Sequence, residues 1–364
     1  MAEPDGRIGH DAGGIPLTAV SAATGRTHPS RLAVRAFPTR GRVSTIAGIG
    51  VHVPPRVLTN ADLERMMDTS DRWIVERTGI HERHVAEPGT ASWELGTLAG
   101  QQALDAAGVA PTDVDLVMVA SSSPDAPFPS MACRVQERLG LENAWAFDLL
   151  AACTGLLYET AIADAMIASG RAETVLVIGA EVLSRLLDWN DRSTAVLLGD
   201  AAAAMVVRGA EHGGGFRSWC LGSDGRQWDL LAFGDRAEKG AYAAGDPSPH
   251  FKMQGPETFK YAVESFTRSA GAALDAAGLG VDDVDLFVPH QANRRIIEAA
   301  ARRVGIPAER VMIDVDRYGN TSTATIPIAL QEAQQQGRVQ PGSRVLLASF
   351  GSGLTWAACV IEWE

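Results

Sequence analysis

Short runs of aliphatic residues alternate with longer, alanine-rich stretches along most of this chain. The clearest apolar runs cover residues 114–120, 174–178, 284–288 and 345–349. Runs of this length are typical of buried strands, whereas the alanine-rich stretches between them are typical of helices. The alternation predicts an α/β fold built in layers, whose regular part begins near Ser44.

An internal repeat is also visible. The letters ALDAAG and DVDL, at residues 103–108 and 113–116, recur with the same spacing at 273–278 and 283–286. A Val-Leu pair that begins at 175 in one apolar run recurs at 345, which is the same offset along the chain. A shared offset indicates a duplicated unit, and its period is too long for a solenoid. We therefore predict two similar halves.

The first part of the chain differs from the rest. Residues 1–42 carry six arginines against three acids and show no apolar period, so we predict a dispensable, disordered extension over residues 1–43. The extension lacks the apolar centre of a secretory signal and only weakly resembles a transit peptide. The two halves are then expected at residues 44–209 and 210–364.

Composition narrows the possible classes of protein. The 364 residues are 46% hydrophobic, and no apolar run approaches the roughly 18 residues of a membrane span, so extensive disorder and a transmembrane protein are excluded. A net charge of −12 argues against broad binding of nucleic acid, and an acidic partner would need a local basic patch. The four cysteines form no C-x-x-C pair, which predicts neither a disulfide framework nor a zinc site and favours the cytoplasm.

Cys153 is the first candidate for chemistry. It lies between an apolar run and a predicted helix that extends to about Ser169. A helix N-terminus offers unpaired N–H groups and about half a positive charge, which can lower a cysteine pKa from about 8.5 into the range of roughly 3.5 to 7.5. Such a sulfur attacks thioesters well. Taken alone, a buried and inert cysteine is the simpler explanation.

Two further candidates lie in the second half. His290 follows the run at 284–288, where a predicted strand passes into a helix, and strand ends are where α/β sheets place chemistry. A capping or core-edge histidine is the alternative. Asn320 follows Gly319 and precedes another predicted helix, where a helix cap is the default explanation.

The repeat connects these residues. The segments around Cys153 and Asn320 occupy nearly corresponding places in the two halves, which predicts one site with pseudo-two-fold symmetry. A cysteine nucleophile with neutral histidine and asparagine donors suits acyl transfer through an enolate, because the donors can stabilise the enolate oxygen. Nothing in the pattern indicates a metal cluster.

At this point the sequence can be compared with a known family. From Ser44 to Glu364 it resembles β-ketoacyl-acyl carrier protein synthase III, a condensing enzyme of the thiolase superfamily. The resemblance rests on seven ordered motifs: TNADLE (59–64), DRWIVERTGI (71–80), AACTG (151–155), DWNDRST (188–194), VPHQAN (288–293), YGNTS (318–322) and FGSGLTW (350–356). It implies a thiolase-like fold, in which a duplicated unit forms five α-β-α-β-α layers.

The resemblance also implies a reaction. Cys153 would be acylated by an acyl-CoA, and His290 with Asn320 would hold the thioester carbonyl of malonyl-acyl carrier protein while it loses carbon dioxide. The resulting carbanion would attack the acyl-cysteine, starting fatty acid synthesis or a polyketide or specialised lipid pathway. The backbone N–H groups of Cys153 and Ser352 would form the oxyanion hole. No cofactor or metal is implied.

Binding residues follow from the same resemblance. The CoA tunnel of the family corresponds to Trp73, Arg77 and Arg192, with adenine between Trp73 and Arg192. Phe128 matches an aromatic residue that reaches across the family's dimer interface into the partner's acyl pocket, so a homodimer is implied. A core aromatic residue and surface ion pairs are the alternatives for the tunnel residues.

The acyl carrier protein is acidic and needs a basic surface. Arg295 and Arg302 are seven residues apart and share one face of the helix after His290, with Arg294 and Arg303 beside them. Lys260 lies on an earlier helix. The family docks its carrier here, and a merely solvated charged face is the alternative.

The chain departs from the family pattern at three places. Alanines stand at 201–204 where the family alternates glycine, Ser352 and Leu354 replace glycine and phenylalanine, and Pro256 replaces an asparagine that contacts pantetheine. Because alanine and serine do not adopt positive φ as readily as glycine, these changes put the choice of substrate in question.

Two other functions remain open from the sequence. A related acyltransferase would pass the acyl group from Cys153 to an alcohol, an amine or a carrier thiol without forming a carbon–carbon bond. A non-catalytic partner subunit would shape the pocket of another enzyme. The Cys, His and Asn set favours condensation, and the presence of Cys153 argues against a non-catalytic subunit.

Overall fold

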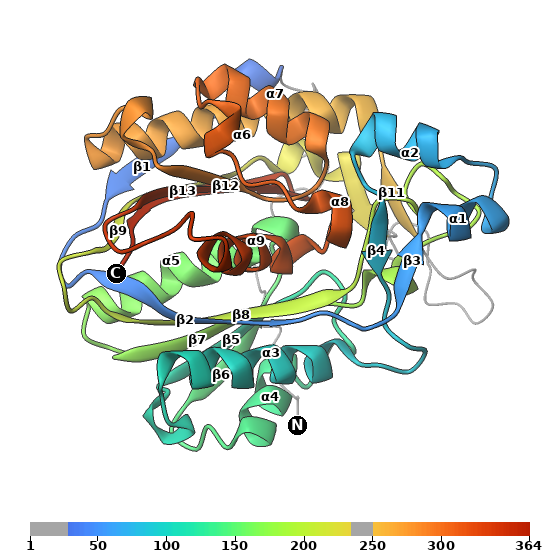
Figure 1. Ribbon diagram of the computed structural model, residues 1–364. Helices are drawn as coiled ribbons and strands as arrows, with labels where there is room; N and C mark the ends of the chain where they lie inside the picture. Colours follow the sequence, from blue (N-terminus) through green and yellow to red (C-terminus); the bar gives the residue numbers. More distant parts are fainter. Residues whose placement is uncertain (1–27, 234–249) are drawn as a thin grey trace, which may run out of the picture.

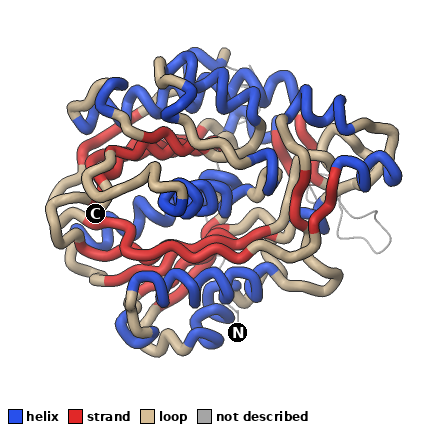
Figure 2. Tube along the Cα trace, in the orientation of Figure 1, coloured by secondary structure: helices blue, strands red, loops and turns tan. Residues whose placement is uncertain are grey.

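Two five-stranded sheets lie face to face, with helices between them and on both outer sides (Figure 1). The computed structural model describes residues 28–233 and 250–364. Five layers follow one another in the order helix, sheet, helix, sheet, helix, as Figure 2 shows by element type. This is the duplicated α/β architecture that we expected.

The first sheet has the strand order β2-β8-β7-β5-β6. Its strands are β2 (Ser44–His52), β5 (Leu116–Ala120), β6 (Trp145–Leu149), β7 (Thr174–Glu181) and β8 (Ala201–Gly209). Every residue of β5 is buried, because helices cover both faces of the sheet. The outer helices are α3 (Ser92–Ala107) and α4 (Met131–Leu139), and the inner one is α5 (Gly155–Ala168).

Glycine lets one of the outer helices approach this sheet closely. A Cβ at Gly50 of β2 would lie 2.1 Å from the carbonyl oxygen of Ala99 on α3, far inside any permitted contact. The backbone of α3 therefore rests directly on β2, which a larger residue at Gly50 would prevent.

The second sheet has the order β1-β9-β14-β13-β12. Its strands are β1 (Arg35–Pro38), β9 (Gly215–Ser223), β12 (Leu286–Pro289), β13 (Arg344–Gly351) and β14 (Thr355–Glu362). Helices α6 (Gly255–Ala277) and α7 (Arg294–Val304) cover its outer face, and α9 (Thr325–Gln335) lies beside α5 between the sheets.

The predicted repeat corresponds to a structural one. The offset in sequence from the start of β5 to the start of β12 equals the offset from β7 to β13 and from helix α5 to helix α9. Each of these helices follows a short 3-10 turn, Ala152–Thr154 in the first half and Ser322–Ala324 in the second. The two turns meet between the sheets, which brings the two halves together at one place.

The predicted start of the ordered part was wrong. Residues 35–38 form β1, which pairs antiparallel with β9, and Leu32 is buried with 1% of its surface exposed. Backbone hydrogen bonds to the edge of β9 order this segment, and they leave no hydrophobic period in the sequence. Residues 1–27 of the predicted extension lie outside the described residues.

Smaller elements gather at the end of the molecule shown on the right of Figure 1. They are β3 (Val57–Thr59), α1 (Asn60–Met66), α2 (Asp71–Thr78), β4 (Glu82–His84), β10 (Leu231–Phe233), β11 (Phe251–Met253) and α8 (Val315–Tyr318). Arg83 is fully buried there and donates to the carbonyls of Leu58 and Val196, so it ties β3 to the loop before β8. Over the part of the chain that is described, no helix combines the length and apolar character needed to cross a membrane.

Candidate active site

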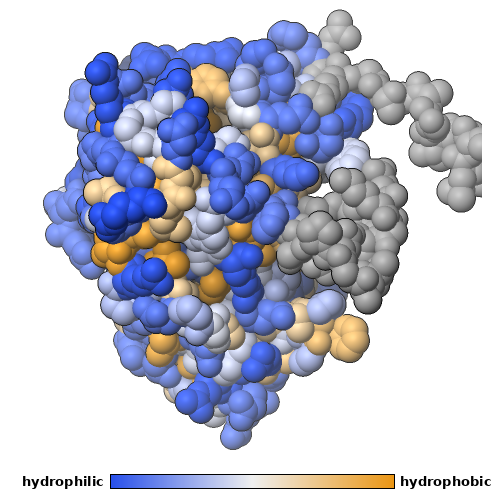
Figure 3. Space-filling view, turned by 90° about the vertical axis from the view of Figure 1, so that its right-hand side faces the viewer, coloured by the Kyte–Doolittle hydropathy of each residue, from blue (hydrophilic) through white to orange (hydrophobic). Residues whose placement is uncertain are grey.

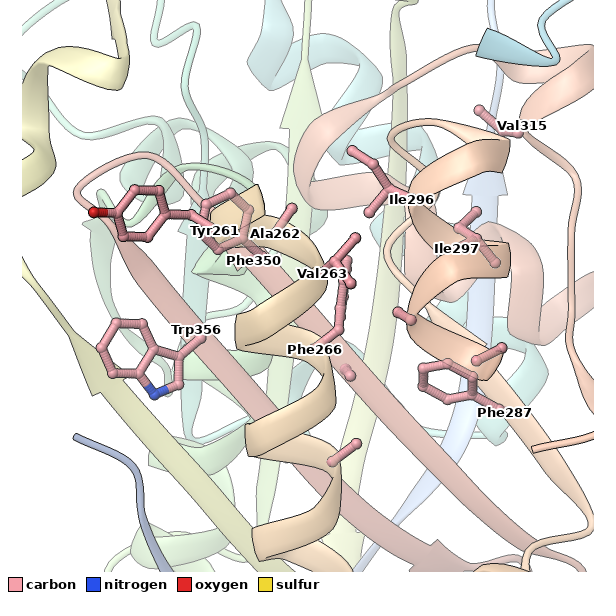
Figure 4. Packing of buried hydrophobic residues seen from close by; sticks show 14 of the residues in the cluster. Tyr261, Ala262, Val263, Phe266, Phe287, Ile296, Ile297, Val315, Phe350 and Trp356 are labelled. Carbon is pink, nitrogen blue, oxygen red and sulfur yellow. The ribbon is translucent and has the colours of Figure 1, made fainter. Parts of the chain in front are cut away.

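A cavity of about 710 Å³ lies where the two halves meet. Cys153 comes from the first half and His290 and Asn320 come from the second, and all three line this cavity. Its walls are mostly apolar; Figure 4 shows Ala262 and Phe266 of α6 and Ile296 of α7 within this packing. The three residues singled out in the sequence are therefore brought together, although they lie far apart along the chain.

Cys153 lies in the 3-10 turn Ala152–Thr154, directly before α5. Ala152 has a φ of 46°, which turns the chain sharply and presents the next residue to the cavity. The Cys153 carbonyl accepts a hydrogen bond of 2.8 Å from the Ser349 hydroxyl of β13. The nucleophile position is thus held by both halves of the molecule.

The charge state of Cys153 differs from the sequence-based expectation. Burial raises the pKa of the thiol to about 12, although a hydrogen bond with Ser322 acts in the opposite direction. The prediction of a lowered pKa considered the helix N-terminus and not the loss of hydration. In this structure the sulfur carries its proton at neutral pH, so thiolate formation requires a proton acceptor.

His290 is fixed just after the end of β12. Its backbone N–H donates to the Ala348 carbonyl of β13 at 2.8 Å, and its Nδ1 lies 2.7 Å from the Thr325 hydroxyl. Burial lowers the pKa of His290 to about 3, so the imidazole is neutral at physiological pH. With Nδ1 engaged by Thr325, Nε2 is the ring nitrogen available to a ligand in the cavity.

Asn320 is oriented by the turn that follows it. Its Oδ1 accepts a hydrogen bond of 2.8 Å from the Ser322 backbone N–H, so the amide NH₂ is the group that can donate into the cavity. The backbone of Asn320 bridges to the first half, because its N–H donates to the Leu197 carbonyl at 2.8 Å. Asn320 is therefore a neutral donor, and the neutral His290 joins it as a donor in the tautomer that carries its proton on Nε2.

The turn between β13 and β14 packs against the nucleophile. A Cβ at Gly351 would lie 2.9 Å from the Cys153 backbone nitrogen, so only glycine permits this approach. Ser352, the predicted oxyanion-hole residue, follows directly, and its hydroxyl donates to the Leu231 carbonyl at 2.5 Å. Gly351 lines the cavity, whereas Ser352 is not among the lining residues.

The three residues expected to bind CoA lie together at the mouth. Trp73 and Arg77 line the cavity, and the guanidinium carbons of Arg77 and Arg192 lie 4.5 and 5.1 Å from the centre of the Trp73 ring. Arg192 also donates to the Asp68 carbonyl at 2.6 Å. This face of the molecule, seen in Figure 3, shows hydrophobic patches among polar residues.

Two of the four basic residues expected to dock a carrier protein line the cavity, and the other two do not. Lys260 and Arg295 line the outer cavity, and Arg294 and Arg302 are exposed on α7. Lys260 pairs with Glu257 at 2.8 Å and Arg294 with Glu298 at 2.9 Å, so the charge of these two is partly balanced.

Phe128 lies away from the cavity and is 83% exposed. Trp145 and Leu150, at the two ends of the edge strand β6, are 49% and 79% exposed. Phe128 is not among the residues that line the cavity of its own chain, and its contact with a partner subunit stays a prediction.

The alanines at 201–204 and the serine at 352, which replace glycines of the family pattern, adopt backbone conformations that do not require glycine. Ala201–Ala204 lie within β8, fully buried and paired with β2 and β7, and none of them has a positive φ. Ser352 does not have a positive φ either. The expected conformational cost is therefore absent, while Pro256 lines the cavity without a backbone N–H to donate.

Sequence reasoning missed several residues around the site. Thr325 orients His290, Ser322 begins the turn that meets the turn of Cys153, and Glu181 is a fully buried carboxyl that accepts a hydrogen bond from Thr323 of that same turn. The repeat was the one signal that bore on them, because it aligns the turn of Ser322 with the turn of Cys153. Among the described residues, no cluster of three or more histidine, cysteine, aspartate or glutamate side chains is arranged to hold a metal.

Family models and relatives of one kind match this chain. Models described as 3-oxoacyl-[acyl-carrier-protein] synthase III and its C-terminal part match residues 147–225 and 274–363. A beta-ketoacyl-[acyl-carrier-protein] synthase III of Desulfitobacterium hafniense (strain Y51) is 49% identical over 322 residues, covering 88% of this chain and 97% of that protein.

Solved structures similar to this chain include members of the same family. The 3-oxoacyl-[acyl-carrier-protein] synthase III from Aquifex aeolicus VF5 is 42% identical with a TM-score of 0.83, over 88% of this chain and all of that one. The priming β-ketosynthase from the R1128 polyketide biosynthetic pathway is 34% identical with a TM-score of 0.84, over 89% and 97% of the two chains.

The five-layered fold, with a thiol in an apolar cavity between its halves, defines an acyltransferase of the thiolase-like class. The identity extends over nearly the whole length of the relatives and includes the segments that form the cavity. The chain belongs to the β-ketoacyl-acyl carrier protein synthase III family.

Proposed function

We propose that this protein condenses an acyl-CoA starter with malonyl-acyl carrier protein, with loss of carbon dioxide, through an acyl group on Cys153. The observation that carries the proposal is that the thiol, the imidazole and the carboxamide line one cavity although they come from separate elements. The alternative, transfer of the acyl group to another acceptor, uses the thiol but gives no role to the two oriented donors.

The first half-reaction loads the enzyme. The acyl-CoA enters past Trp73, Arg77 and Arg192, and the apolar walls take up its acyl chain. The Cys153 sulfur attacks the thioester carbonyl, and the backbone N–H groups of Cys153 and Ser352 stabilise the tetrahedral oxyanion. The close approach of Gly351 to the Cys153 backbone nitrogen supports this role, because it holds the two N–H groups near each other. The carbon–sulfur bond to CoA then breaks, and CoA leaves as a thiol that takes up the proton given up by Cys153.

The second half-reaction forms the carbon–carbon bond. Nε2 of His290 and the amide of Asn320 donate to the thioester carbonyl of the malonyl group, and loss of carbon dioxide leaves an enolate on that oxygen. In a site that excludes water, each such donor contributes about 2.7 to 4 kcal/mol to the transition state. The enolate carbon attacks the acyl-cysteine carbonyl, and the bond from that carbonyl to the Cys153 sulfur breaks. The β-ketoacyl chain leaves on the carrier, and the released Cys153 thiolate takes up a proton.

The carrier docks on the basic mouth in this proposal. Arg302 is exposed on α7, and among the described residues no carboxylate forms a salt bridge with it. We expect Arg302→Glu to weaken carrier binding about ten-fold and to raise KM for malonyl-acyl carrier protein, while acylation by acyl-CoA keeps its rate. Unchanged carrier affinity would refute the docking site.

A homodimer completes the proposal. Phe128, Trp145 and Leu150 are exposed apolar side chains, and in this proposal a second copy of the chain covers them. Trp145→Arg is then expected to lower the molar mass in analytical ultracentrifugation from that of a dimer to that of a monomer.

All four cysteines are unpaired, which suits a reducing compartment, and we assign the protein to the cytoplasm.

Intact-protein mass spectrometry tests the central claim. The enzyme is mixed with a panel of acyl-CoAs, then with malonyl-acyl carrier protein, and the masses of both proteins are followed. Condensation predicts an acyl adduct on the enzyme, absent from Cys153→Ala, and then a β-ketoacyl chain on the carrier. Movement of an unchanged acyl group to another acceptor would favour simple transfer, and full product formation by Cys153→Ala would refute the nucleophile.

The same mass spectrometry distinguishes initiation of fatty acid synthesis from a polyketide or specialised lipid pathway. The panel includes short, branched and aromatic acyl groups, because the 710 Å³ cavity has room for more than an acetyl group. Preference for a short or branched starter supports initiation of fatty acid synthesis, and preference for an unusual starter supports a polyketide or specialised lipid pathway.

A further inference from the structure

The turn that follows Asn320 contains a strained residue. Ser322 has a φ of 49°, and its backbone N–H donates to Oδ1 of Asn320 at 2.8 Å. A residue other than glycine keeps such a conformation only where its surroundings enforce it. The orientation of the Asn320 amide therefore depends on what holds the turn Ser322–Ala324 in place.

Thr323 anchors this turn on the first half of the molecule. Its hydroxyl donates to Oε1 of Glu181, the last residue of β7, at 3.0 Å. Its backbone rests on the same strand, because a Cβ at Gly179 would lie 2.8 Å from the carbonyl carbon of Thr323. Thr323 and Glu181 are both buried, so their hydrogen bond is shielded from water.

Glu181 is itself fixed by the loop after β5. The Ser122 backbone N–H lies 3.1 and 3.0 Å from its two carboxyl oxygens, and the Ser123 hydroxyl donates to Oε2 at 2.7 Å. The Ser121 hydroxyl is farther from Oε2, at 3.3 Å. Rotation of the carboxyl group away from Thr323 would therefore break hydrogen bonds on both of its oxygens.

The internal repeat relates this contact to the one that holds the nucleophile. The sequence offset from β7 to β13 also relates Cys153 to Thr323 and Glu181 to Gly351. Each turn meets the end of the strand in the opposite half: Cys153 meets Gly351 of β13, and Thr323 meets Glu181 of β7. The position that carries the nucleophile in the first half therefore carries an anchoring hydroxyl in the second.

We propose that Glu181 and Thr323 are positioning residues for the decarboxylation step of the proposed function, on which this inference rests. Their hydrogen bond holds Ser322 at its positive φ, which keeps the Ser322 N–H on Oδ1 of Asn320 and leaves the amide NH₂ free to donate to the malonyl thioester. Without the hydrogen bond, the turn relaxes and the amide loses its orientation. Acylation of Cys153 uses the turn of the other half and is spared.

The test separates the two half-reactions. Decarboxylation of malonyl-acyl carrier protein is followed by carrier mass in a Cys153→Ala background, where no condensation follows, and single-turnover acylation by acyl-CoA is measured with Cys153 present. Thr323→Val is expected to slow decarboxylation about ten-fold or more, while acylation stays within about three-fold of the wild type. Thr323→Ser keeps the hydroxyl and is expected to restore decarboxylation.

Thr160→Val is the matched control for the loss of a buried hydroxyl. Thr160 is a buried threonine of α5, and its hydroxyl donates to the Leu156 carbonyl of the same helix. This variant is expected to leave the rates of both half-reactions unchanged.

A double-mutant cycle tests whether the effect passes through Asn320. Once Asn320→Ala has removed the amide, Thr323→Val is expected to slow decarboxylation no further. Glu181→Gln replaces one of the two acceptor oxygens by an NH₂ group, so it is expected to slow the same step. Combined with Thr323→Val, it should add no further loss. Where Thr323→Val does not fold, Glu181→Gln carries the test.

The outcomes are distinct. Slower decarboxylation with preserved acylation, restored by Thr323→Ser and absent in the Asn320→Ala background, supports the positioning role. An equal loss in both half-reactions, or a loss that persists without the Asn320 amide, overturns it. If Thr323→Val decarboxylates at the rate of its parent, only the positioning role fails. If Cys153→Ala does not decarboxylate and the wild type does not condense, the proposed function fails and the positioning role falls with it.

Discussion

Ala152 and Ser322 occupy the same backbone position in the two halves of the molecule, and both have positive φ values, 46° and 49°. Among the described residues they are the only ones other than glycine with this conformation. Each begins the short turn before an inner helix, one presenting Cys153 and the other following Asn320. The duplication thus brings two strained turns together at one site.

The positive φ of Ala152 leads to a prediction about stability and about acylation of the neighbouring Cys153. A β-branched side chain is disfavoured at positive φ, so Ala152→Val is expected to lower the free energy of unfolding by about 1–3 kcal/mol and to slow acylation of Cys153. Ala152→Gly, which tolerates the conformation, is the matched variant and should keep the wild-type stability within about 1 kcal/mol. Urea unfolding and single-turnover acylation measure both; equal stability of the valine variant would contradict the prediction.

Thr325 is predicted to control the tautomer of His290. Its hydroxyl lies 2.7 Å from Nδ1 and 3.0 Å from the Ser322 carbonyl, and its single proton can be donated to only one of these two acceptors. When it donates to Nδ1, Nε2 carries the proton that decarboxylation needs. We expect Thr325→Val to lower kcat about ten-fold or more with little change in KM for malonyl-acyl carrier protein.

Thr325→Ser keeps the hydroxyl and serves as the conservative control for this prediction. Its kcat should stay close to that of the wild type, and acylation of Cys153 should be preserved in both variants. An equal loss of kcat in the serine and valine variants would assign Thr325 to packing alone.

The pH dependence of malonyl decarboxylation should not show the titration of the His290 imidazole. Burial lowers the pKa of His290 to about 3, so protonation begins only in strong acid and the neutral donor persists across the working range. In Cys153→Ala, malonyl-acyl carrier protein decarboxylation is therefore expected to show no transition near the ordinary histidine pKa of 6.5. A transition there that disappears in Cys153→Ala/His290→Gln would mean that the imidazole is hydrated and titrates normally.

Glu159 should make the protein less stable as pH rises. It is fully buried on α5, neither of its oxygens has a hydrogen-bond partner, and burial raises its pKa well above 4.5. Because the folded-state pKa is raised, its contribution to stability is present below about pH 4.5 and is lost as pH rises towards the folded-state value.

Glu159→Met should remove this loss. We expect it to raise the free energy of unfolding by about 1–3 kcal/mol at about pH 8 and by much less at about pH 5, since an uncompensated buried charge is replaced by an apolar group of similar size. Urea unfolding at the two pH values measures the difference, with the exposed Glu142→Gln as a control. A gain of the same size at both pH values would point to packing as its cause.

The sequence by itself determined the layered α/β class, the duplication and the three residues that meet in the cavity. These are carried by hydrophobic periodicity, by a constant offset between repeated segments and by motifs around Cys153, His290 and Asn320, all of which are read from the order of residues alone. The family resemblance added the tunnel and docking residues on the same basis.

Only the tertiary structure decided the environment of those residues. The raised pKa of Cys153 and the neutrality of His290 come from burial by both halves, and the orientation of His290 depends on Thr325, a residue of another element. Strand β1 is ordered by the edge of β9 and not by its own pattern. Hydration and hydrogen-bond partners are set by what the fold packs around a group, so the order of residues alone does not reveal them.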